Sequence, residues 1–199
     1  MPVPAPRSRR HATPATRRAQ ILHAAQRCIA EKGYHAATMD DIVRAAGLSK
    51  GSLYWHFGSK EEVFLALFDA IVEEVFAAWE QEAAATANTL DLIQRQGDIV
   101  IERLSSQRKL LRAWAEFFNH PAGRARLAAV YRRTRNTLNR LVRRGISRGE
   151  LRKLPAPAVS AAITALGEGL VVQAVVDPEF AAWKHWPVMR DIMRRGLAA

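Results

Sequence analysis

Hydrophobic residues recur along much of the chain at intervals of three and four, which is the spacing of one face of an α-helix. The pattern is clearest in residues 21–29, 63–79 and 127–146. Sustained alternation of polar and apolar residues, which is typical of a half-buried strand, is not found in the sequence. We therefore expect an all-α protein.

Glycine and capping residues divide this pattern into separate helices. Gly33 and Gly47 are placed to end helices, whereas Thr38, Ser49 and Ser59 are placed to begin them. An acidic residue three positions after Thr38 and after Ser59 gives each the spacing of a capping box. The helices predicted from these signals span about residues 16–32, 38–46, 50–57, 59–87, 90–105, 107–119, 123–148, 157–176 and 187–197. Residues 1–15, rich in Pro and Arg, are expected to form a disordered basic tail.

Residues 38–60 carry the most specific local pattern. Two short helices, 38–46 and 50–57, are separated by only three residues. Gly47 can adopt the positive φ that reverses the chain in so short a turn, and apolar residues of both helices can close a small core between them. This spacing predicts a helix-turn-helix, whose second helix enters the major groove of DNA.

The second of these helices has polar and aromatic side chains where an ordinary amphipathic helix would show Glu and Lys. Lys50 and Ser52 lie near its start, where side chains reach base edges. Tyr54 and His56 can donate to phosphates, and Gly51 lets the backbone approach DNA closely. The remaining candidates for DNA contact are Arg44, which should face outward, Ser49, which caps the helix, Trp55, taken as partly core, and Lys60, expected to touch phosphate.

The excess of basic residues in the N-terminal part of the chain also predicts an anionic partner. The protein has 199 residues and a formal net charge of +11, and residues 1–60 hold ten basic residues against three acidic ones. A second cluster, residues 124–153, has eleven basic residues and Glu150 as its one acidic residue. This cluster is either a solvated helix face or a secondary contact with nucleic acid or an acidic partner.

Other functional classes find little support in the sequence. The single cysteine, Cys28, excludes a disulfide framework and a CxxC site. A Ser/His/Asp set, a metal-ligand spacing and a phosphate-binding glycine loop are all missing, so we expect no enzyme, no cofactor and no metal. Residues 154–176 are apolar, but Glu168 and many small residues favour a buried helix over a membrane span. Without an apolar targeting segment we expect a cytoplasmic protein; a helical enzyme or a membrane-surface protein is the alternative.

The segment 38–60 also resembles the TetR family of bacterial transcriptional regulators. The resemblance rests on Thr38, Ile42, 45–49, Gly51, Leu53, Tyr54, His56, Phe57 and Lys60, with 21–25 and 31–34 upstream. It implies a homodimer with a DNA-binding domain, here residues 16–62, and a variable ligand-binding and dimerisation domain, residues 63–199. It further implies that Thr38 caps its helix and touches phosphate.

The same resemblance implies the mode of action. Most members are repressors that a small-molecule effector releases from a palindromic double-stranded DNA operator. A ligand-independent regulator or an activator is the alternative within the family.

Aromatic residues of the second domain are candidates for a ligand pocket. Such a group can line a ligand cavity or can belong to the hydrophobic core, and the sequence is compatible with both. A buried Glu116 would favour a cationic or hydrogen-bonding ligand, unless Arg112 pairs with it across one helical turn. The candidate pocket residues are Phe76, Trp79, Trp114, Glu116, Phe117, Phe118 and His120.

The helix expected at 157–176 is rich in Ala and Gly, which allow close helix approach. Together with the last helix it resembles the dimer-forming pair of the family, and two such pairs would make a four-helix bundle about a two-fold axis. The candidate interface residues are Val159, Ala162, Ile163, Leu166, Gly169, Leu170, Val188 and Ile192.

Overall fold

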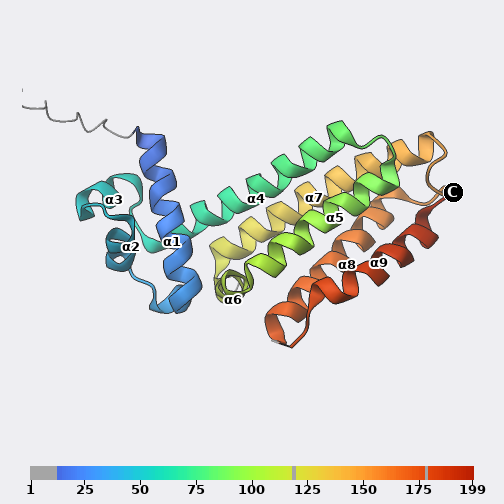
Figure 1. The fold of residues 1–199 in the computed structure, drawn as a ribbon. Coiled ribbons are helices and arrows are strands. Elements are labelled where there is room, and N and C mark those ends of the chain that lie inside the picture. The colour runs from blue at the N-terminus through green and yellow to red at the C-terminus, as the bar shows by residue number, and fades with distance from the viewer. Residues whose placement is uncertain (1–12, 118–119, 178) are drawn as a thin grey trace, which may run out of the picture. The chain divides into compact units, whose positions relative to one another are not determined.

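A computed structural model describes residues 13–117, 120–177 and 179–199, without the side chains of Leu104, Arg112, Glu116 and Phe117. Within these residues the chain is helical and contains no extended strand (Figure 1), which confirms the expectation of an all-α protein. The helices are α1 (Pro14–Ala36), α2 (Met39–Ala46), α3 (Lys50–His56), α4 (Lys60–Ala85), α5 (Thr89–Ser106), α6 (Arg108–Phe117), α7 (Pro121–Ser147), α8 (Ala156–Val176) and α9 (Ala182–Leu197).

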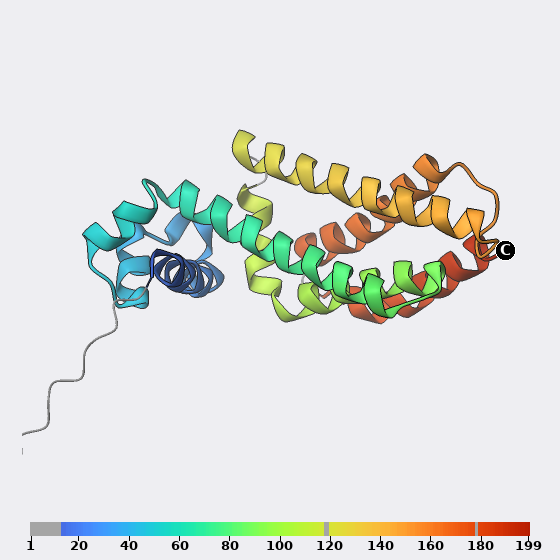
Figure 2. The same cartoon turned by 90° about the horizontal axis from the view of Figure 1, so that it is seen from above.

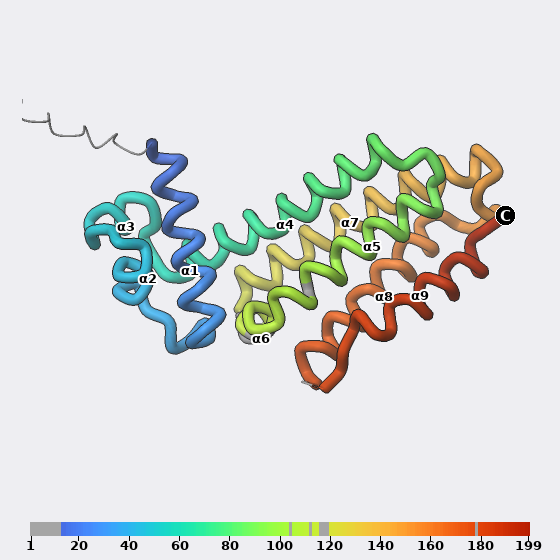
Figure 3. Tube along the Cα trace, in the orientation of Figure 1, coloured from blue at the N-terminus to red at the C-terminus, as the bar shows by residue number. Residues whose placement is uncertain are grey.

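The chain divides into two compact units, one that ends at Leu67 and one that begins at Phe68. The boundary falls inside α4, and the path of the chain through each unit can be followed in Figure 3. In the first unit α1 packs against α2, and α2 against α3. Their shared core contains the apolar positions that the helical spacing indicated: Ile21, Ala25, Ile29, Ile42, Leu53 and Phe64 are all buried.

Several helix boundaries differ from those predicted. Helix α1 does not end at Gly33: it continues to Ala36 past a kink at this residue, whose φ is 80°. Thr13 caps α1 and Pro14 occupies its first turn, so residues 13–15 belong to this helix and not to a tail. The expectation for residues 1–12 lies outside the described residues. Helix α9 begins five residues before Pro187 and contains this proline. Ala182 and Trp186 are buried in the core, and their packing holds the first turn of α9 together ahead of a residue that cannot donate a backbone hydrogen bond.

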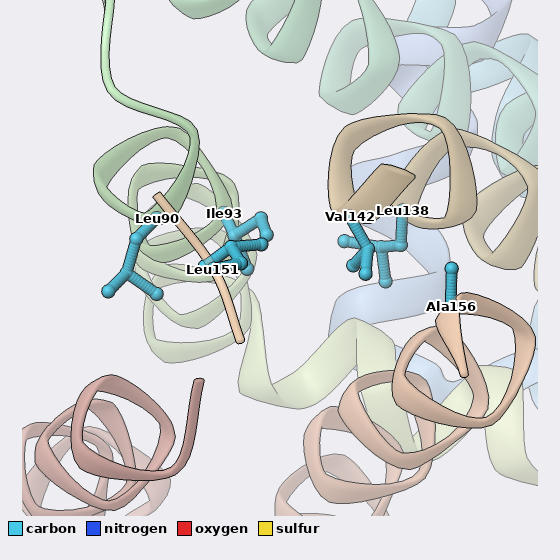
Figure 4. Packing of buried hydrophobic residues seen from close by; sticks show 6 residues of the cluster. All are labelled: Leu90, Ile93, Leu138, Val142, Leu151 and Ala156. Carbon is cyan, nitrogen blue, oxygen red and sulfur yellow. The ribbon is translucent and has the colours of Figure 1, made fainter. Parts of the chain in front are cut away.

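The second unit is a bundle in which α7 packs against α8 and α5 against both α7 and α9 (Figures 1 and 2). One core cluster joins α5, α7 and the start of α8 (Figure 4); its buried members are Leu90, Ile93, Leu138, Val142, Leu151 and Ala156. A second cluster joins α5, α8 and α9 and consists of Ile101, Leu170, Ala182, Trp186 and Met193.

Helix α8 is unusually apolar. By length and composition alone it could cross a membrane, and it is the one such helix among the described residues. It packs instead against α6, α7 and α9, yet Leu166, Val172 and Val176 remain exposed on it. Val188 and Ile192 of α9 are also exposed, by 63% and 62%. The pair α8–α9 therefore presents apolar side chains that its own chain does not cover.

Candidate nucleic-acid interface and ligand cavity

Side-chain caps and a glycine fix the turn between α2 and α3. Thr38 Oγ1 accepts the Asp41 N–H at 3.1 Å, and Asp41 Oδ2 accepts the Thr38 N–H at 3.1 Å, which completes a capping box. Gly47 has a φ of 63° and ends α2 in the left-handed region. Ser49 Oγ then accepts the Ser52 N–H at 3.2 Å and begins α3. These three predictions of local structure are confirmed.

Asp41 also ties α2 to α1. Lys32 Nζ lies 2.7 Å from Asp41 Oδ1. The hydrogen bonds from Lys32 and Thr38 hold the pKa of Asp41 down at about 2, so this carboxylate is ionised at neutral pH. Arg44 reaches the same oxygen at 3.3 Å from its exposed position on α2. It faces outward, as the sequence suggested.

The outer face of α3 is aromatic. Leu53 and Phe57, four residues apart, point inward and are buried. Tyr54 and Trp55 point outward, with 50% and 72% of their surface exposed, and the Trp55 ring meets the His56 ring edge-on at 4.6 Å. The expectation that Trp55 is partly core is wrong, because the inward positions of this short helix are already taken by Leu53 and Phe57.

Lys50 is held by a partner that the sequence did not indicate. Its Nζ lies 2.8 Å from Asp40 Oδ2, and both side chains are more than half exposed. The hydrogen bond that Lys50 donates to Asp40 raises the pKa of Lys50. The pair joins the first turn of α2 to the first turn of α3. Asp40 lies in the first turn of α2, and its proximity to α3 across the turn gives it this contact as well.

Gly51 needs no special backbone conformation, and a Cβ built on it would meet no atom of the protein within 4 Å. Packing within the chain therefore gives no reason for a glycine at this exposed position of α3. Contact with another molecule gives one, because a missing side chain allows that molecule to reach the backbone.

Lys60, which the sequence predicts to touch phosphate, makes several contacts within the first unit. Its Nζ donates to the carbonyl oxygens of Tyr34, His35 and Ala37 at 2.8, 3.1 and 3.0 Å, and it lies 4.6 Å from the centre of the Tyr34 ring. Burial lowers the pKa of Lys60. All three ammonium protons thus cap the end of α1, and this geometry favours a structural role.

The second unit contains a cavity of about 520 Å³ between α4, α5, α6, α7, α8 and α9. Phe76, Trp79 and Trp114 lie in its wall, with the Phe76 and Trp79 rings 4.9 Å apart. The candidate pocket residue Phe118 and the side chains of Glu116 and Phe117 lie outside the described residues. His120 does not line the cavity: it is exposed and caps α7, where its Nδ1 accepts the Ala122 N–H at 3.4 Å.

Three polar residues that the sequence did not indicate as pocket residues lie in the cavity wall. The Tyr131 hydroxyl donates to Glu168 Oε1 at 2.6 Å, and both residues line the cavity. Gln96, which is 3% exposed, also lines it, and its Oε1 has no hydrogen-bond partner among the described residues. A signal was present for Glu168, a lone acid in an apolar helix, but the sequence could not show that α7 brings a tyrosine to it.

The candidate interface residues divide into two groups. Ala162, Leu166, Val188 and Ile192 are exposed, and an added Cβ on Gly169 would meet no atom of the chain within 4 Å. Leu170 is only 3% exposed because it packs in the second core cluster. Its assignment to the interface is therefore wrong: α8 turns this residue toward its own bundle. Val159 and Ile163 are partly buried against the core.

A helix-turn-helix with an exposed second helix defines the class of DNA-binding proteins to which this geometry belongs. Residues 21–67 match the sequence profile described as "Bacterial regulatory proteins, tetR family", and residues 100–199, half of the chain, match "BetI-type transcriptional repressor, C-terminal". The chain belongs to the TetR family of bacterial regulators.

Individual relatives resemble this chain in sequence over only part of its length, whereas solved structures resemble its fold over most of its length. The transcriptional repressor KstR2 of Mycobacterium tuberculosis is 39% identical over 79 residues, which are 40% of each chain. A regulator from Saccharomonospora viridis, solved with choline, has 23% identity and a TM-score of 0.78, with 92% of this chain and 97% of that one covered. FadR from Bacillus subtilis, solved with stearoyl-CoA, has 19% identity and a TM-score of 0.73, with 89% and 98% covered.

Proposed function

We propose that this protein is a transcriptional regulator, in the simplest case a repressor, that binds a palindromic operator through α3. The observation that carries the proposal is the outer face of α3, where exposed aromatic and basic side chains flank a glycine that internal packing does not require. Lys50 and Ser52 read bases, and Tyr54, Trp55 and His56 contact backbone or base. Thr38 and Ser49, which cap α2 and α3, and the exposed Arg44 of α2 add further contacts to DNA. No catalytic step is part of this function, and a cytoplasmic location suits it.

The two lysines that flank α3 are expected to respond differently to substitution. Lys50→Ala removes a base contact, so operator affinity should fall by roughly 1–3 kcal/mol per half-site, with relaxed preference at particular bases. Lys60→Ala removes the cap of α1, so the free energy of unfolding should fall by roughly 1–3 kcal/mol while the salt dependence of binding stays the same. Thermal melts and salt titrations on selected and scrambled DNA measure both effects.

The exposed Lys109 of α6, which belongs neither to the first unit nor to the basic cluster 124–153, provides the matched control as Lys109→Ala. It should change neither quantity. A smaller salt slope in Lys60→Ala without loss of stability would show that Lys60 contacts phosphate after all.

A homodimer formed through α8 and α9 supplies the two-fold symmetry that a palindromic operator requires. The exposed apolar residues Leu166, Val188 and Ile192 support this placement. Gly169 supports it as well, because its missing side chain leaves room for a helix of the second copy.

A small effector bound in the cavity of the second unit would control the affinity for DNA. The wall is formed by residues of six helices, so a ligand there contacts most of the bundle. The regulators solved with choline and with stearoyl-CoA share this fold. Because ligands of such different chemistry fit one architecture, the residues of the wall, rather than the fold, must select the effector.

Tryptophan fluorescence can test this control directly. Trp79, Trp114 and Trp186 line the cavity, so a variant with Trp55→Phe and Trp183→Phe reports binding from the wall alone. We expect compounds that change this fluorescence to lower the operator affinity of the unmodified protein by about 5- to 150-fold, the usual range of coupling between two sites. If every compound that binds leaves operator affinity the same, the cavity is not an effector site.

A further inference from the structure

Several hydrogen-bond donors in the cavity wall already have acceptors inside the protein. Trp79 Nε1 donates to the Gln96 carbonyl oxygen at 3.1 Å, and Trp186 Nε1 donates to Asp98 Oδ1 at 2.7 Å. Burial raises the pKa of Tyr131, and its hydrogen bond to Glu168 adds to this effect, so the hydroxyl stays protonated and remains committed to Glu168. A ligand in the cavity therefore finds few unused donors.

The hydrogen-bond acceptors of the cavity wall, by contrast, receive few hydrogen bonds from the protein. The Tyr131 hydroxyl is the one hydrogen-bond donor that reaches the Glu168 carboxylate from the described residues, and no cation of those residues forms an ion pair with it. The buried Oε1 of Gln96 has no partner among them either. Arg103 also lines the cavity, but its guanidinium pairs with Glu74 at 3.0 Å.

A carboxylate in an apolar cavity favours ligands of one charge over others. A neutral ligand that displaced water would leave the Glu168 carboxylate with the Tyr131 hydroxyl but without an opposite charge, and an acidic ligand would be repelled. A cation would gain an ion pair strengthened by the low dielectric. The aromatic rings of the wall, such as Trp79 and Trp114, offer apolar area for the rest of the ligand. The Phe76 ring already has the Arg133 guanidinium 3.8 Å from its centre.

We propose that Glu168 is the counter-ion for a protonated amine carried on an apolar body, and that hydrophobic amines are the effector class of this protein. The proposal rests on the effector function above and narrows it to one ligand chemistry. The ammonium would lie beside the Glu168 carboxylate. The apolar body would fill the aromatic part of the cavity.

Direct calorimetric binding to the full-length protein tests the proposal with phenylbutylamine and its neutral counterpart phenylbutanol. We expect the amine to bind roughly tenfold tighter than the alcohol, as one charge-assisted hydrogen bond allows. Glu168→Gln should abolish this difference. The amide oxygen still accepts the Tyr131 hydroxyl proton, so the wall should keep its shape, which a thermal melt checks.

Glu102→Gln is the matched control, because it removes the same charge from an exposed position of α5 outside the cavity. It should retain the preference for the amine. Equal affinity for amine and alcohol in the unmodified protein, failure of the amine to bind, or an equal loss in both variants would each overturn the proposal.

Operator binding separates this proposal from the effector function itself. If the amine binds through Glu168 but leaves operator affinity unchanged, the ligand class stands and the effector function fails. If amine and alcohol bind equally well and both release the operator, the effector function stands and the ligand class is wrong.

Discussion

Replacement of Gly169 by arginine is expected to convert the protein into a monomer that has lost most of its operator affinity. A Cβ added to Gly169 would meet no atom of the surrounding chain within 4 Å, and arginine is a better helix former than glycine by up to about 1 kcal/mol. The isolated chain should therefore fold. In the proposed four-helix interface, the same side chain would place bulk and charge against the partner copy.

The loss of affinity should be large because a monomer binds one half-site without help from the second. Coupling of two binding units commonly contributes roughly 10²- to 10⁴-fold, and we expect Gly169→Arg to lose an amount in this range. Sedimentation gives the mass and fluorescence anisotropy gives the operator affinity. Ala84→Arg, at an exposed position of α4 outside the proposed interface, is the control and should leave both unchanged. A dimer of normal mass and affinity in Gly169→Arg would show that the interface lies elsewhere.

Gly51→Ala is expected to stabilise the first unit and, at the same time, to weaken operator binding. Alanine in place of a helical glycine adds roughly 0.5–1 kcal/mol to the free energy of unfolding, and no atom of the protein lies within 4 Å of the new methyl group. If the backbone of α3 lies against DNA, that methyl group occupies the space of a base edge or a phosphate. We expect a loss of roughly 1–3 kcal/mol at each half-site, the value of one good contact.

The opposite signs of the two effects make the experiment decisive. Gly196→Ala is the matched control, since Gly196 is also an exposed helical glycine whose added Cβ would meet nothing within 4 Å, but it lies in α9. It should stabilise the protein without changing the half-site contacts. Chemical denaturation and operator titration compare the two variants. Unchanged operator affinity in a stabilised Gly51→Ala variant would mean that α3 does not approach DNA through this face.

The amino-acid sequence by itself determined the helical class and most helix ends. It also identified the helix-turn-helix. These features depend on residues no more than four positions apart: the Thr38–Asp41 capping box, the left-handed Gly47 and the Ser49 cap all act within one turn of the chain. The periodicity of apolar positions likewise follows from helix geometry alone. Such local interactions are encoded directly in residue order, so they could be predicted.

Only the tertiary structure decided which distant groups meet. Lys60 caps carbonyls more than twenty positions earlier, Tyr131 reaches Glu168 from another helix, and Leu170 is buried because α8 turns it toward α5 and α9. Tertiary structure also decided where α9 begins, because burial of Ala182 and Trp186 stabilises a helical turn just before Pro187. These contacts depend on the rotation and packing of whole helices, which the 3.6-residue period leaves undetermined. The packing of the helices therefore decides which polar and aromatic groups line the cavity.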